Sequence, residues 1–122
     1  MTRAVAVMCL ALLLAAAAGC QSSSPPRGTA TGILLRVGGM APGSPVPLPG
    51  KVTATSTAGG PTVIGRIGKN GRFRIMLPPG SYRFTGTSPL IGSGKATCTA
   101  ARPVTIRPAR TTSGIKIICS IS

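Results

Sequence analysis

The sequence predicts an all-β protein, with a single sandwich of seven to eight short strands that follows a cleaved signal peptide. From residue 31 onward, apolar and polar residues alternate over short runs, which is the period of a half-buried strand. The 17 glycines and 12 prolines recur between these runs and mark turns. No segment after the amino-terminal apolar run has helical periodicity, so we expect no helix in the mature domain.

The amino terminus, residues 1–19, is predicted to be a signal peptide. Arg3 supplies a positive charge, an unbroken apolar run covers residues 4–18, and the run ends in small residues. Charge, a short apolar core and small residues in this order indicate export. The apolar run is also shorter than the roughly 20 residues that a membrane-spanning helix needs.

The sequence "AAGC" at residues 17–20 resembles the lipobox of bacterial lipoproteins, with Ala17 in place of the usual leucine. The resemblance implies that Cys20 is lipidated and becomes the first residue of the mature chain. Residues 20–30 would then be a lipid-anchored linker. Two acyl chains give on the order of 20 kcal/mol of membrane affinity, which makes the anchor effectively permanent. The alternative is ordinary cleavage near Ala18 and a freely secreted protein.

Two cysteines, Cys98 and Cys119, remain after removal of the signal peptide and of Cys20. An exported chain meets an oxidising compartment, so we expect this pair to form a disulfide. A closed loop of about 22 residues stabilises a fold by roughly 3 kcal/mol in the chain-entropy model.

The predicted sandwich domain covers residues 31–122. In residues 32–37, Ile33, Leu35 and Val37 lie on one side of the first strand, and residues 38–50 are too rich in Gly and Pro to be anything but a loop. Gly65 is a candidate bulge. The later strands are expected near residues 51–57, 61–67, 72–77, 82–84, 95–99, 103–108 and 114–122.

The stretch "GRFRIMLPPGSYRF" at residues 71–84 alternates on both sides of a Pro-Pro-Gly turn. This alternation predicts a half-buried antiparallel strand pair. Its apolar face would carry Phe73, Ile75, Leu77, Tyr82 and Phe84. Arg72, Arg74 and Arg83 would share the solvent face.

Three short motifs resemble the carboxypeptidase regulatory-like, transthyretin-like sandwich: "PLPGKV" at 47–52, "NGRF" at 70–73 and "LPPGSY" at 77–82. The chain departs from the family pattern at Asn70, where the family usually has an acid. The resemblance covers about residues 30–122 and implies an immunoglobulin-like or transthyretin-like sandwich. It also implies an accessory, structural or binding role and carries no catalytic residue across.

The composition excludes most catalytic sites, because the chain has no Asp, no Glu and no His. Paired carboxylates, a Ser-His-Asp triad and carboxylate or imidazole metal sites all need those side chains. We therefore expect no enzymatic activity, no metal and no cofactor.

The formal charge of +14 suggests an anionic partner. A single-strand nucleic-acid binder would add exposed aromatic platforms, but all three aromatics are predicted to face the core. Near an anionic leaflet each basic residue contributes about 1 kcal/mol of binding free energy, so anionic lipids or cell-wall polymers are the expected contacts of Arg72, Arg74 and Arg83.

The sequence thus predicts a lipid-anchored protein of the cell envelope that acts as a binding or scaffolding module. The alternatives are a freely secreted carbohydrate- or protein-binding module and a basic surface that only meets solvent.

Overall fold

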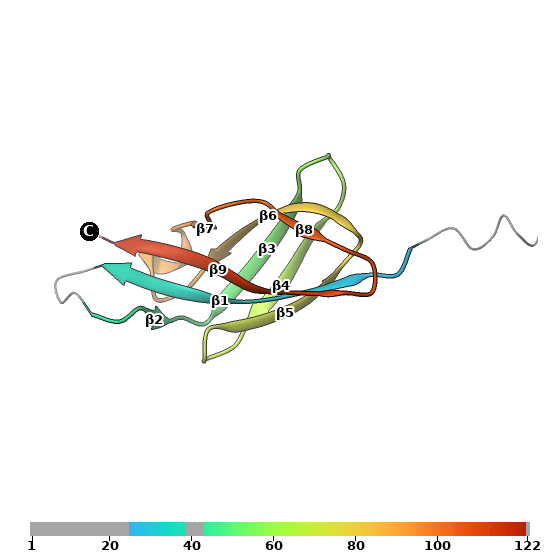
Figure 1. The fold of residues 1–122 in the computed structure, drawn as a ribbon. Helices are drawn as coiled ribbons and strands as arrows, with labels where there is room; N and C mark the ends of the chain where they lie inside the picture. The colour runs from blue at the N-terminus through green and yellow to red at the C-terminus, as the bar shows by residue number, and fades with distance from the viewer. Residues whose placement is uncertain (1–24, 39–42, 122) are drawn as a thin grey trace, which may run out of the picture.

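The computed structural model describes residues 25–38 and 43–121, and this part of the chain is nearly all β (Figure 1). The predicted signal peptide and Cys20 lie outside the described residues. The strands are β1 (Gly28–Gly38), β2 (Val46–Pro47), β3 (Gly50–Ser56), β4 (Thr62–Ile67), β5 (Arg72–Leu77), β6 (Gly80–Thr87), β7 (Cys98–Ala100), β8 (Val104–Ile106) and β9 (Thr111–Ile121). A short 3-10 turn covers Gly92–Gly94. The described strands number nine rather than seven to eight, and one of them, β2, lies inside the stretch predicted to be a loop.

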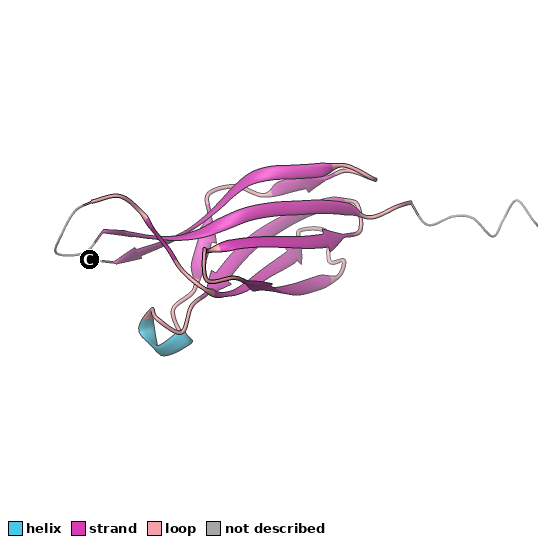
Figure 2. Cartoon of the chain, turned by 90° about the horizontal axis from the view of Figure 1, so that it is seen from below, coloured by secondary structure: helices cyan, strands magenta, loops and turns pink. Residues whose placement is uncertain are grey.

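The strands form one mixed sheet in the order β2-β1-β9-β7-β6-β3-β4, with β5 paired to β1 and β8 paired to β6. The sheet curls, so that two halves face each other as in a sandwich (Figures 1 and 2). We call β2, β5, β1 and β9 the β1 layer, and β4, β3, β6 and β8 the β3 layer. Strand β7 connects the layers because it pairs with both β6 and β9. The predicted all-β, sandwich-like class is confirmed.

Strand β1 lies at the centre of its layer. It pairs in parallel with the last strand, β9, and antiparallel with β5 on its other side. It begins at Gly28, so the final residues of the predicted linker already belong to the sheet. Thr29 and Ala30 are buried, and the Thr29 N–H donates to the carbonyl oxygen of Arg110 at 2.9 Å. Strand β1 therefore begins three residues before the predicted domain boundary at residue 31 (31 − 28 = 3).

The core lies between the two layers and follows the predicted alternation in most strands. In β5 every second residue is buried, and the same pattern holds through β6. The rings of Phe73 on β5 and Phe84 on β6 stack with their centroids 6.2 Å apart. The other buried residues with apolar side chains are Ala30, Leu34, Leu48, Val52, Ala54, Ile67, Ile75, Leu77, Tyr82, Cys98, Ile106, Ile115, Ile117 and Cys119. Aromatic residues thus fill the middle of the sandwich, as the sequence predicts.

The predicted pairing of the two strands within residues 71–84 is wrong. Strand β5 pairs with β1, whereas β6 pairs with β3, β7 and β8, so the two strands lie in opposite layers. Pro78 and Pro79 have no N–H with which to continue a ladder, and the chain crosses there from one layer to the other. The hydroxyl of Tyr82 donates to the carbonyl oxygen of Pro78 at 2.7 Å and fixes this crossing.

The structure also shows which face of β1 is buried, and it corrects the expectation for Gly65. The side of β1 that carries Ile33, Leu35 and Val37 is the outer face of the β1 layer, and the core residue between them is Leu34, which is fully buried. Gly65 is not a bulge, because the β3–β4 register continues through it. A Cβ atom at Gly65 would clash with Ile75 of the facing layer, so this glycine permits close packing of the layers.

Candidate functional site: basic groups on the outer faces

The basic side chains of the described residues face solvent. Every Lys and Arg from residue 27 onward is exposed except Arg36, which is half-buried. Because the chain has no Asp and no Glu, no side-chain carboxylate is available to pair with them. These cations can therefore be neutralised only by anions from outside the fold, apart from the chain's own terminal carboxyl group.

The outer face of the β1 layer brings three cations together around Ile33. In the sheet register, Ile33 lies between Arg72 on β5 and Lys116 on β9. Arg74 lies two residues further along β5, opposite Thr31 of β1. Neighbouring strands lie about 4.8 Å apart, so Arg72 and Lys116, with β1 between them, are about 10 Å apart at the backbone, and a single extended anion can reach both long side chains. We call Arg72, Arg74 and Lys116 the β1-layer cations.

A hollow of about 370 Å³ lies beside these cations. It forms where the register between β1 and β9 shifts after Ala30. A Cβ atom at Gly114 would meet no heavy atom within 4 Å, so the space at this shift stays open. The lining residues are Thr31, Gly32, Ile33, Arg72, Phe73, Ser113, Gly114, Ile115 and Lys116. Two cations and two hydroxyl side chains therefore border an otherwise largely apolar recess.

The predicted grouping of Arg72, Arg74 and Arg83 on one face is wrong. Arg72 and Arg74 lie on the outer face of the β1 layer, but Arg83 lies on the outer face of the β3 layer, opposite Thr55 of β3. The reason is the layer crossing at residues 78–80, which places the two strands on opposite sides of the core. All three side chains are exposed, as predicted.

Lys116 is the member of the basic group that sequence reasoning missed. Its exposure follows from the alternation in β9, where Ile115 and Ile117 are buried. Its position beside Arg72 depends on β1 lying between β5 and β9, and no local pattern shows that arrangement.

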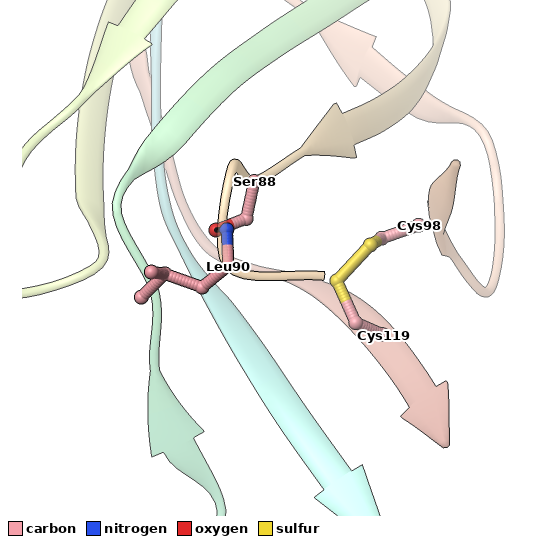
Figure 3. The surroundings of a disulfide bond; sticks show 4 residues. All are labelled: Ser88, Leu90, Cys98 and Cys119. Carbon is pink, nitrogen blue, oxygen red and sulfur yellow. Dashed lines mark hydrogen bonds between the residues drawn. A yellow bond between two sulfur atoms is a disulfide. The ribbon is translucent and has the colours of Figure 1, made fainter. Parts of the chain in front are cut away.

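The predicted disulfide is present. Cys98 on β7 and Cys119 on β9 are bonded, with their Cα atoms 4.6 Å apart. Figure 3 shows the bond near the turn that follows β6, where the fully buried Ser88 accepts a hydrogen bond from the Leu90 N–H at 3.3 Å through its hydroxyl oxygen. The bond fastens the short strand β7, which connects the layers, to the carboxyl-terminal strand.

Comparison of the chain with protein-family models found no match, and comparison with curated proteins found none either. Within the described ranges no helix is long and apolar enough to cross a membrane.

Proposed function

We propose that this protein is a lipid-anchored protein of the bacterial cell envelope and acts there as a non-enzymatic binding or scaffolding module. Its signal peptide directs export, and a diacylglycerol on Cys20 holds it to the membrane surface. The domain that follows belongs, on this proposal, among the carboxypeptidase regulatory-like sandwiches. Its basic surface binds anionic envelope components, either lipid headgroups or cell-wall polymers.

The observation that supports this proposal best is the exposure of cations without any carboxylate partner. A typical soluble domain pairs many of its surface charges, whereas here each charge is left to external anions. The β1-layer cations add a specific place, because Arg72 and Lys116 border the hollow between β1 and β9. An anionic group that sits beside them gains charge-assisted hydrogen bonds, which are about twice as strong as neutral ones.

The absence of an exposed aromatic surface argues against a carbohydrate-binding platform. The three aromatic residues of the chain, Phe73, Tyr82 and Phe84, are at most 4% exposed. Sugar rings therefore find no stacking partner on the sandwich, and the charge of the surface becomes the main source of recognition.

The lipid anchor is tested by Cys20→Ala. The variant is expected to lose its acyl chains and to leave the membrane fraction in a high-salt wash, whereas the wild-type chain stays. If the variant also remains in the washed membranes, or if mass spectrometry finds no acyl group on wild-type Cys20, the anchor proposal is wrong.

Binding is tested with purified anionic wall fragments in a sedimentation assay at low and high salt. Arg72→Gln combined with Lys116→Gln should weaken binding and flatten its salt dependence, since screening acts on these charges. A matched control, Lys51→Gln combined with Arg83→Gln, removes the same charge from the β3 layer. Equal losses in the two double variants would show that only net charge matters and that the hollow is not a site.

A further inference from the structure

A second group of basic residues lies where the chain enters the domain. Backbone hydrogen bonds hold the two segments that carry these residues together. Residues 107–110, "RPAR", form the turn between β8 and β9. The Ala109 N–H of this turn donates to the carbonyl oxygen of Arg27 at 3.2 Å, just before β1 begins. Figure 1 shows the turn at the end of the sandwich where β1 starts. Arg27, Arg107 and Arg110 are thereby gathered at one end of the molecule, and all three are exposed.

Hydrogen bonds and close packing between the turn and the start of β1 fix the position of these arginine residues. The carbonyl oxygen of Arg110 accepts the Thr29 N–H at 2.9 Å, so two hydrogen bonds attach the second half of the turn to the start of β1. A Cβ atom at Gly28 would clash with the carbonyl oxygen of Arg107 and with Ile106, so the two segments are in direct contact. We call Arg27, Arg107 and Arg110 the entry arginines.

Arg27 is the described cation nearest to Cys20 along the chain, and the turn holds Arg107 and Arg110 beside it. Gly28 is eight residues from Cys20 (28 − 20 = 8), and a fully extended chain covers at most about 3.5 Å per residue. The anchor therefore holds this end of the sandwich within about 28 Å of the membrane surface.

The opposite end of the sandwich is separated from the entry arginines by the length of a strand. Strand β6 runs from Gly80, which is paired with Ile106 near the entry arginines, to Thr87 at the far end. Eight residues of antiparallel strand span about 27 Å at roughly 3.4 Å each. The Debye length at physiological ionic strength is about 8 Å, so cations at the far end are screened from a membrane that the entry end touches.

We propose that the entry arginines dock on the anionic phospholipid headgroups of the membrane that carries the anchor. The sandwich then stands on this end, and the hollow beside Arg72 and Lys116 stays free for a second anionic ligand. This inference rests on the proposed lipid anchor and adds to it the orientation of the domain and the lipid class that it contacts. The chemistry is that of guanidinium groups with phosphates, which match each other in bidentate geometry.

The test uses the acylated protein, purified from membranes and reconstituted into vesicles. The chain contains no Trp, so one introduced Trp is a fluorescence reporter without background. Thr111→Trp places the reporter at the first residue of β9, next to the entry arginines, and Leu90→Trp places it on an exposed site beyond the far end of β6. The vesicles contain a headgroup spin label as quencher and either phosphatidylcholine alone or an equal mixture with phosphatidylglycerol.

With phosphatidylglycerol at low salt, the reporter at residue 111 should be strongly quenched and the reporter at residue 90 should not. Arg107→Gln combined with Arg110→Gln should lower the ratio of docked to undocked protein roughly thirtyfold, since each cation near an anionic surface contributes about fivefold to sixfold and the two factors multiply. Lys51→Gln combined with Arg83→Gln removes the same charge from the outer face of the β3 layer and should leave the quenching at residue 111 unchanged.

Two outcomes would overturn the inference while leaving the anchor in place. One is equal quenching of both reporters in anionic vesicles. The other is a loss of quenching in the outer-face variant and not in the turn variant, which would mean that the domain lies on its side. If the purified chain carries no acyl mass and does not enter vesicles, the proposed function itself fails and the inference falls with it.

Discussion

Removal of the Phe73 ring should destabilise the domain far more than any change on the outer side of the same strand. The ring is 4% exposed and stacks on Phe84 of the opposite layer, so Phe73→Ala opens a cavity between the layers. Phe→Ala substitutions in cores cost about 3–5 kcal/mol, which combines lost burial with the cavity that remains. For a domain of this size each kcal/mol lowers Tm by at least about 4 °C, so we expect a decrease of at least about 12 °C.

The matched control is Met76→Ala on the same strand, where the side chain is 55% exposed. Surface substitutions of this kind usually change stability by no more than about 0.5 kcal/mol. Both variants would be unfolded in urea and followed by far-UV circular dichroism, with equal slopes against denaturant as the check on two-state behaviour. Similar losses in the two variants, or a larger loss for Met76→Ala, would show that the inner and outer faces of β5 are assigned the wrong way round.

Three other changes test the connections between the layers in the same urea assay. Cys119→Ser should lower the free energy of unfolding by about 2–5 kcal/mol, and mass spectrometry of the wild-type chain should find no free thiol at this position. Tyr82→Phe should cost about 1 kcal/mol, because it removes the hydrogen bond to the Pro78 carbonyl oxygen, and a neutral result would show that this bond does not hold the crossing. Gly65→Ala should cost about 1–3 kcal/mol because its methyl group meets Ile75 of the facing layer, and a stabilised variant would contradict that contact.

The phase of most strands could be predicted from the sequence because burial is a local signal. In β5 apolar residues alternate with two arginines, and in β9 Lys116 lies between Ile115 and Ile117, so only one face can enter the core. The signal fails in β1, where Ile33, Leu34 and Leu35 are consecutive apolar residues. Which face of β1 is buried depends there on Gly32, because its missing side chain leaves room for the ring of Phe73 on the neighbouring strand.

The partners of the strands could not be predicted in the same way, and the candidate site depends on them. The Pro-Pro-Gly stretch at residues 78–80 is compatible with a tight turn between paired strands and with a crossing between layers. Only contacts with distant segments, such as the pairing of Thr55 with Arg83, decide between the two. The same holds for Arg72 and Lys116, which are 44 residues apart (116 − 72 = 44) and are brought together by β1 between them.

The chain has a formal charge of +14 and no carboxylate side chain. Added salt should therefore raise the stability of the fold and weaken its binding to anions. Because no Asp or Glu is present, the electrostatic interactions among the side chains of the sandwich are repulsive, and self-repulsion of this kind destabilises a compact state. The repulsion is kept low because the cations are spread over both outer faces and the entry end of the sandwich.

Added salt screens the repulsion that remains, so the urea midpoint of the purified domain should rise between low and physiological ionic strength. The same salt should weaken attachment to anionic vesicles or wall fragments, because that attraction uses the same exposed charges. A midpoint that falls with salt, together with binding that does not change, would mean that the cations are already neutralised within the fold, and the proposed use of the basic surface would then have no physical basis.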